Sequence, residues 1–138
     1  MAPLGTPMLH KELTQQVINA AKAVHNELGP GLPHKFYREA MELELREIGA
    51  AVEVDKPVKV HYRGQTLGEL GVDFCVNDAI VCVLVDNDEI TPDDYGLART
   101  LLKNLELDVG LLLKFNGSRL DVRRVEAVPA KKQTSATT

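Results

Sequence analysis

The sequence predicts one α/β (α+β) domain with a mixed central sheet flanked by helices. Three observations predict it. The length of 138 residues suits a single compact domain. Three segments carry apolar residues at helical spacing, and two short apolar runs are typical of strands buried on both faces. The remaining strands alternate or lie between turn residues, so the expected order is ααβββαββ.

Two helices come first. The first is expected from about His10 to Leu28, because its apolar residues form one stripe at helical spacing. The glycines and prolines of 29–33 end it. The second is expected over 34–48, with Gly49 as its C′ residue. Four positions of the second helix should face inward: Tyr37, Met41, Leu45 and Ile48.

Three strands follow. Residues 51–62 alternate in polarity, and Pro57 indicates an edge strand or a bulge. Residues 66–76 form the next strand, which Gly68 and Gly71 should loosen. Residues 79–85 are apolar without a break, so they predict a central strand buried on both faces.

A third helix and two strands complete the domain. Thr91-Pro92-Asp93-Asp94 is a strong helix start, with Thr as N-cap and Pro at the first helical position. The Asn116-Gly117 pair should turn the chain between strands at 109–115 and 119–125. The domain would span 10–127, between a loose arm at 1–9 and a polar tail at 128–138. The inward residues of the third helix should be Leu97, Leu101, Leu102 and Leu105.

The charge of the chain argues against nucleic acid as a partner. The net charge is −4, and it is −6 for 14 basic and 20 acidic residues once Lys131 and Lys132 of the tail are left out. Domains that grip phosphates usually carry a basic surplus. No apolar run approaches the roughly 20 residues of a membrane-spanning helix, and 1–9 has no signal-peptide pattern. We therefore expect a cytoplasmic protein without a membrane partner.

The two cysteines and His25 are expected to have structural rather than chemical roles. Cys75 and Cys82 both lie in apolar runs, which favours buried free thiols over a disulfide framework. His25 lies near the end of the first helix, where packing beside the Gly-Pro turn is favoured over a functional role.

Several short motifs occur along the chain in one characteristic order. They are 24–31, a motif that begins at Gly31 and ends at Tyr37, Lys56-Pro57, the Tyr62-Arg63-Gly64 turn, 68–73, 89–92 and 109–113. Through these motifs the chain resembles, from Leu13 to Val125, the GxxExxY family, small bacterial proteins assigned to the PD-(D/E)XK nuclease-like superfamily. The motif from Gly31 to Tyr37 is the one that names the family. The resemblance implies a restriction-endonuclease-like core.

The resemblance also implies where a nuclease site would lie. The family's presumed chemistry uses a Glu in the naming motif, an Asp at the end of one strand and Glu-x-Lys on the next. Such carboxylates hold a divalent cation that activates water, and the lysine adds positive charge near the phosphate. Mapped without gaps, these positions are His34, Asp73, Val83 and Val85, so only the Asp survives. A glutamine usual on the following helix maps to Leu97.

A site with these residues should be inactive. Val83 and Val85 share one face of their strand, and one remaining carboxylate is too few for ordinary Mg²⁺ binding. We therefore expect no catalytic residue, no metal and no cofactor. The alternative is a metal-dependent nuclease with relocated ligands, in which Asp73 acts with Asp86 or Asp88. The acidic run at 86–89 is otherwise a solvated loop before a helix.

Two hypotheses explain why Asp73 would persist without a metal. In the first, Asp73 pairs with His34, and with Tyr37 as a further member, in a polar cluster that replaces the cation. In the second, Asp73 accepts hydrogen bonds from backbone amides, and His34 simply starts a helix in solvent.

The expected function is non-enzymatic. The catalytic residues are lost, but the apolar positions that form the core of each element are kept. This combination is expected of a protein that serves in structure or in partner binding. The first two helices offer flat amphipathic surfaces, so we expect a homo-oligomer, even a large closed assembly. Nucleic-acid binding without cleavage is a third hypothesis, which the charge of −6 opposes.

Overall fold

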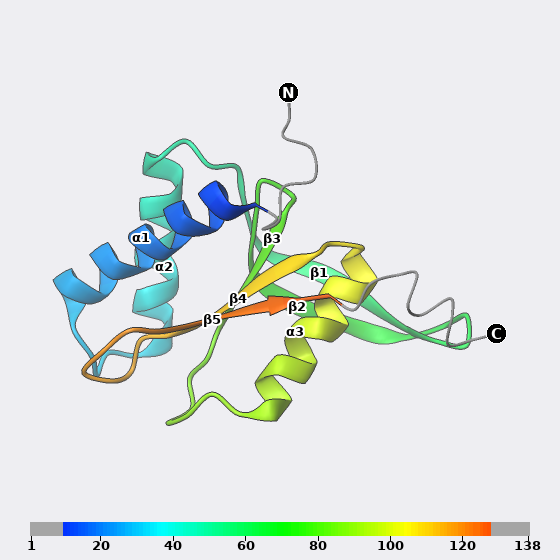
Figure 1. Ribbon diagram of the computed structural model, residues 1–138. Helices are drawn as coiled ribbons and strands as arrows, with labels where there is room; N and C mark the ends of the chain where they lie inside the picture. Colours follow the sequence, from blue (N-terminus) through cyan, green and yellow to red (C-terminus); the bar gives the residue numbers. More distant parts are fainter. Residues whose placement is uncertain (1–9, 128–138) are drawn as a thin grey trace.

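The computed structural model describes residues 10–127, and its elements follow the predicted ααβββαββ order (Figure 1). The predicted arm at 1–9 and tail at 128–138 lie outside the described residues. The helices are α1 (Lys11–Leu28), α2 (His34–Glu47) and α3 (Pro92–Leu105). The strands are β1 (Val52–Tyr62), β2 (Gln65–Val76), β3 (Ile80–Leu84), β4 (Val109–Lys114) and β5 (Asp121–Glu126).

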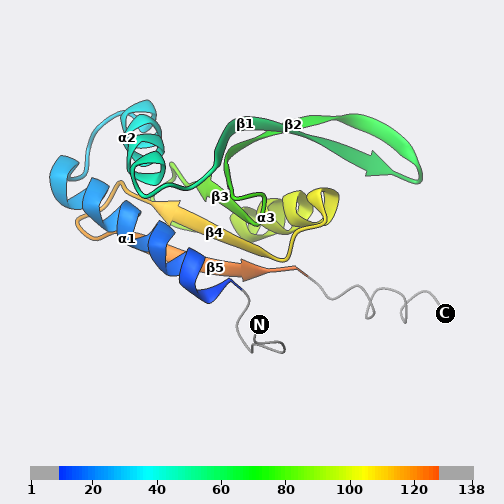
Figure 2. The same cartoon turned by 90° about the horizontal axis from the view of Figure 1, so that it is seen from above.

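The strands form one mixed sheet, as predicted, in the order β1-β2-β3-β4-β5. Strands β3 and β4 are parallel because α3 connects them, and the other neighbours are antiparallel. Helices α1 and α2 pack on one face and α3 on the other (Figure 2). None of the helices in 10–127 combines the length and the apolar character that crossing a membrane requires.

The central strand separates two apolar cores. Ile80, Cys82 and Leu84 belong to the core beneath α1 and α2. Val81, Val83 and Val85 belong to the core beneath α3. This alternation confirms that the segment is buried on both faces.

The start of α3 follows its sequence signal. The Thr91 amide donates to Asp94 Oδ2 at 2.8 Å, which completes a capping box with Pro92 at the first helical position. The inward stripe is shifted from the predicted one, because Ala98 is buried and Leu97 is 39% exposed. The stripe thus runs through Ala98, Leu101, Leu102 and Leu105, at i, i+3, i+4 and i+7.

Two other local predictions were wrong. Ile48 is 45% exposed, because α2 ends at Glu47 and the chain turns away through Gly49, which has a φ of 85°. The last strand begins at Asp121 rather than Arg119, so Asn116-Gly117 belongs to a longer loop over 115–120.

The β1–β2 pair extends well past the rest of the sheet. Strand β3 pairs only with Phe74–Val76 of β2, so residues 56–72 form a two-stranded ribbon that projects from the body (Figure 2). Val58 and Val72 anchor the ribbon in the core beneath α3. Strand β1 is an edge strand, as Pro57 predicted.

Candidate functional site

The surviving acid of the nuclease pattern lies where two strands separate. Asp73 precedes Phe74, which is the first residue of β2 to pair with β3. Its carboxylate spans the resulting gap, because Oδ2 accepts a hydrogen bond of 2.8 Å from the Leu84 amide. Asp73 therefore replaces a missing ladder bond between β2 and β3.

An arginine on α2 neutralises this acid. Arg38 Nε lies 3.4 Å from Asp73 Oδ1, and the guanidinium also donates from Nη2 to Asp55 on β1. The Nε–H is buried and makes no hydrogen bond, so its contact with Asp73 is purely an ion pair. Asp55 has a φ of 56°, which marks an irregularity in β1 where its carboxylate meets the arginine. One cation thus links α2 to both β1 and β2.

His34 has a different partner from the one hypothesised. Its Nδ1 lies 3.7 Å from Oδ1 of Asp86, which belongs to the loop that follows β3. Asp73 is instead partnered by Arg38 and the Leu84 amide. The second hypothesis for Asp73, hydrogen bonding to backbone, is thus the closer one, with an arginine added that neither hypothesis included.

Tyr37 closes the connection between α1 and α2. Its hydroxyl donates to the Gly29 carbonyl at 2.5 Å and accepts from the Leu32 amide at 3.2 Å. Its ring stacks on Phe115, with centroids 4.9 Å apart. The last residue of the naming motif therefore holds the turn and packs in the core beneath α1 and α2.

The two Glu-x-Lys positions are apolar and buried. Val83 is 8% exposed and Val85 is 5% exposed, and both pack in the core beneath α3 with Ala98 and Leu101. The prediction that they share one face is confirmed. Neither position offers an oxygen or a positive charge to a reaction centre.

A divalent cation does not fit these residues. A hard cation needs several oxygen ligands, but the valines supply none and the Asp73 carboxylate already faces Arg38. Within residues 10–127, Asp73, Asp86 and Asp88 join no group of three ligand side chains close enough to share an ion.

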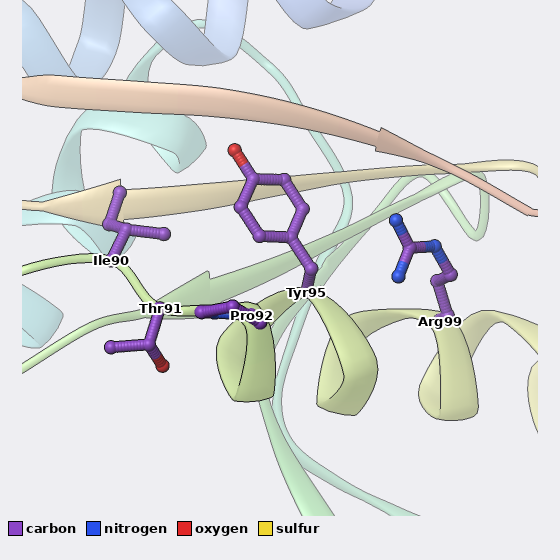
Figure 3. A pocket seen from close by; sticks show the side chains of 5 residues that line it. All are labelled: Ile90, Thr91, Pro92, Tyr95 and Arg99. Carbon is purple, nitrogen blue, oxygen red and sulfur yellow. The ribbon is translucent and has the colours of Figure 1, made fainter.

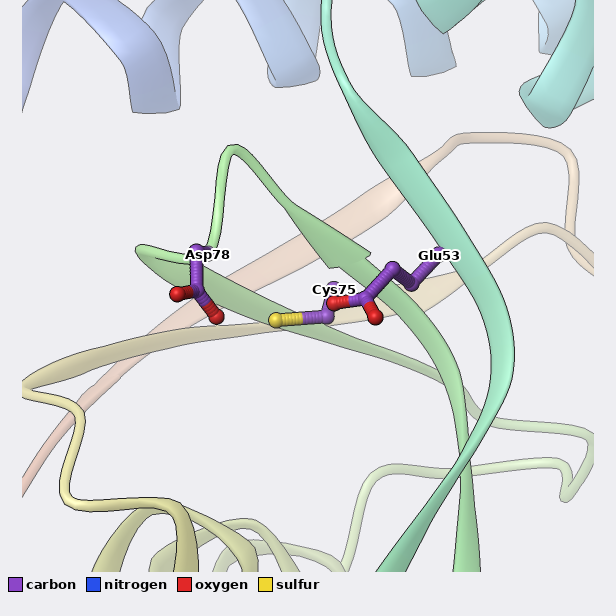
Figure 4. A group of neighbouring side chains, drawn as sticks. All are labelled: Glu53, Cys75 and Asp78. Carbon is purple, nitrogen blue, oxygen red and sulfur yellow. The ribbon is translucent and has the colours of Figure 1, made fainter.

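The described residues do contain one such group elsewhere, Glu53, Cys75 and Asp78 (Figure 4). Lys56 Nζ already donates to both carboxylate oxygens of Glu53, at 3.0 and 3.2 Å. Burial raises the pKa of the Cys75 thiol to about 11, so the thiolate that a metal requires is scarce at neutral pH. Both free cysteines are buried, as predicted. This group is better explained as an ion pair beside a buried thiol.

The fold also gathers an aromatic ring and two arginines that are separated in the sequence. A hollow of about 450 Å³ is lined by Tyr95 and Arg99, which rise from the same side of α3 (Figure 3). The Arg99 guanidinium lies 5.8 Å from the centre of the Tyr95 ring, and Arg123 Nη1 donates to the Tyr95 hydroxyl. Arg123 also donates from Nε and Nη2 to the two carboxylate oxygens of Asp121, at 2.8 and 3.1 Å. Only the i, i+4 spacing of Tyr95 and Arg99 was visible in the sequence.

Sequence reasoning missed Arg38 entirely. A signal was present, because Arg38 lies four residues after His34 and therefore on the same side of α2. Arg38, one turn further along the helix, contacts Asp73, while His34, at the position of the family's Glu, contacts Asp86.

Several solved structures resemble this chain in fold. The crystal structure of SSO0001 gives a TM-score of 0.53 at 14% identity; the match covers 93% of this chain and 63% of that one, so this chain spans less than two thirds of that protein. An alkaline exonuclease, LHK-Exo from Laribacter hongkongensis, gives a TM-score of 0.50 at 11% identity; the match covers 90% of this chain and 87% of that one. The structure of LHK-Exo in complex with dAMP gives a TM-score of 0.50 at 9% identity, and the match covers 91% of this chain and 87% of that one. At these identities the likeness concerns the fold alone.

No curated protein matches the sequence. A family model described as the PD-(D/E)XK nuclease superfamily matches residues 11–125, which is most of the chain. With the mixed sheet and the position of Asp73 at the parting of β2 and β3, this match establishes the family: the chain belongs to the PD-(D/E)XK nuclease superfamily.

Proposed function

We propose that this chain is a catalytically inactive member of its superfamily that acts as a self-assembling structural or partner-binding protein. The observation that carries the proposal is the ion pair between Arg38 and Asp73. A guanidinium stands beside the one carboxylate that survives from the nuclease pattern. Metal-dependent cleavage needs a cation at that carboxylate, and the positive charge of Arg38 repels one.

The proposal of an inactive site has a second support. Replacement of the Glu-x-Lys pair by Val83 and Val85 removes the partner ligand and the lysine together, and packs their space with methyl groups. A nuclease with relocated ligands would need Asp73 to act with Asp86 or Asp88. Asp86 is exposed and lies beside His34, and Asp73 is occupied by Arg38, so this alternative has less support.

Self-assembly is supported by the ribbon of residues 56–72. Two-stranded ribbons are marginally stable in water unless something covers them. Tyr62 and Leu67 are 59% and 67% exposed on this ribbon, and β1 presents a free edge. A second copy that covers the ribbon would bury Tyr62 and Leu67. Leu43 is a further exposed apolar side chain, on α2.

Cleavage is tested with plasmid and single-stranded DNA in the presence of Mg²⁺ or Mn²⁺. The expected result is no cleavage by the wild-type protein. Trace activity that persists unchanged in Asp73→Ala would not come from the site at Asp73. Metal-dependent cleavage that is present in the wild type and lost in Asp73→Ala would overturn the proposal.

Self-assembly is tested by native mass spectrometry and light scattering at micromolar concentration. The wild type is expected above monomer mass, and Leu67→Ser is expected to shift it toward the monomer. Leu97→Ser is the matched control, because Leu97 is an exposed leucine on α3, outside the ribbon. A monomeric wild type would refute self-assembly.

A further inference from the structure

A second hollow lies on the side of the molecule that α1 covers. Its volume is about 470 Å³, within the roughly 300–1,000 Å³ typical of small-molecule sites. One wall is formed by residues between 18 and 26 of α1, and the other is the end of the β4–β5 loop with the start of β5. Figure 2 shows α1 lying along β5, so the hollow is a seam between a helix and a sheet edge.

The hollow is lined by two cations without acidic partners. Lys22 comes from α1 and Arg119 from the loop, and neither has a carboxylate at ion-pair distance in the part of the chain that the structure describes. In a chain of net charge −4, two unpaired cations that face one hollow favour an anion there.

A third cation strengthens the positive field of the loop. Lys114 Nζ lies 3.2 Å from the position that a Cβ of Gly117 would take. Gly117 thus leaves room for the ammonium group to fold over the backbone of the loop. The loop therefore carries positive charge at both ends, from Lys114 and from Arg119.

A buried histidine fixes the two walls relative to each other. His25 of α1 donates from Nε2 to the Gly117 carbonyl at 2.9 Å, since a carbonyl oxygen can only accept. Its ring also stacks on Phe115, at the start of the same loop. His25 is buried and lines the hollow. This bond holds the loop in place before any ligand arrives, which lowers the entropic cost of binding.

The rest of the lining combines polar and apolar groups. Asn26 and Ser118 can donate hydrogen bonds, and Ile18 and Leu120 offer apolar surface. Arginine forms two parallel hydrogen bonds to phosphate or carboxylate oxygens, and lysine acts as a point charge. A ligand that satisfies all of these groups has a doubly charged anionic end and a small apolar body.

We propose that this hollow binds a small phosphate monoester that carries an apolar or aromatic group. The phosphate lies between Lys22 and Arg119, and the apolar group packs against Ile18 and Leu120. This proposal does not depend on the loss of catalysis at Asp73, because it uses neither α2 nor the ribbon.

The test is isothermal titration calorimetry with phenyl phosphate as the probe, at low ionic strength and pH 7.5. Phenyl phosphate is expected to bind at least tenfold more tightly than inorganic phosphate and at least tenfold more tightly than phenol. Lys22→Gln and Arg119→Gln should each weaken its binding about tenfold or more. Matched controls are Lys59→Gln and Arg63→Gln on the ribbon, which should change it less than twofold.

Amide NMR shifts locate the bound probe. On titration of phenyl phosphate, amides of residues 18–26 and 117–122 are expected to move. Absence of binding would overturn the proposal. So would equal affinity for inorganic phosphate, equal losses in the ribbon controls, or shifts confined to other parts of the chain.

Discussion

Arg38 and Asp73 form an ion pair, with Nε and Oδ1 3.4 Å apart, at the point where β2 and β3 separate. Asp73 also accepts a hydrogen bond from the Leu84 amide of β3, and Arg38 also contacts Asp55 of β1. One acid and one base therefore tie α2 to three strands. In the superfamily pattern a metal ion would neutralise this acid, and here a side chain of the protein does.

Substitution of Arg38 by Met should destabilise the fold. The Arg38 and Asp73 side chains are only 26% and 24% exposed, so removal of the cation leaves a largely buried carboxylate without its counter-charge. We expect the free energy of unfolding to fall by about 1–3 kcal/mol, measured by urea unfolding followed by circular dichroism. Arg46→Met is the control, because Arg46 pairs with Glu42 at a more exposed site of the same helix and should cost about 0–1 kcal/mol.

A double-mutant cycle separates the ion pair from general packing. Arg38→Met should cost much less in an Asp73→Asn background, since the only carboxylate that then loses Arg38 is Asp55, whose side chain is 70% exposed. Equal costs in the two backgrounds would show that Arg38 stabilises the fold by its packing alone.

Restoring the Glu-x-Lys pair should not restore a nuclease. Val83→Glu with Val85→Lys places two charges in the core beneath α3, among residues such as Ala98 and Leu101. We expect a loss of several kcal/mol in unfolding free energy and no gain of Mn²⁺ binding by calorimetry. Leu97→Gln is the control, because its position is partly exposed and the change should cost little. A stable, Mn²⁺-binding double variant would contradict this account.

Most of the fold could be predicted because its elements carry local signals. The Thr91-Pro92 start, the unbroken run at 79–85 and Pro57 on an edge strand each depend on residues near in sequence. The inward stripe of α3 was misplaced because Leu97 is as apolar as Leu101, and only the packing direction of the helix selects Ala98 over it. Periodicity alone does not distinguish stripes one residue apart when both flanks are apolar.

The contacts of the candidate site could be predicted only in part. The absence of Glu and Lys at Val83 and Val85 is visible in the sequence. The partner of Asp73 is not, because Arg38 is a long side chain on an element 35 residues earlier, and its reach depends on how α2 lies over β1 and β2. The gathering of Lys22 and Arg119 at one hollow depends on the docking of α1 against β5 in the same way.

Substitution of Tyr37 by Phe should loosen the connection between α1 and α2. The ring and its stacking on Phe115 are retained, but two hydrogen bonds to the backbone at Gly29 and Leu32 are lost. We expect a decrease of about 1–2 kcal/mol in the free energy of unfolding by urea. Tyr62→Phe is the matched control, since Tyr62 is exposed on the ribbon and its loss of a hydroxyl should be nearly neutral. Equal effects in the two variants would argue against a special role for the Tyr37 hydroxyl.

The two buried thiols should make the fold less stable at alkaline pH. Burial raises the pKa of Cys75 to about 11, and burial also raises the pKa of Cys82. In the unfolded chain both thiols ionise near pH 8.5–9, so between about pH 9 and 11 the unfolded state releases protons that the folded state retains. Their contribution to stability is complete below about pH 8.5 and is lost as the pH rises toward 11. Urea unfolding at pH 8, 9 and 10 should show this decline, and it should be shallower in a Cys75→Ala, Cys82→Ala variant. Parallel declines in the two proteins would assign the effect to other groups.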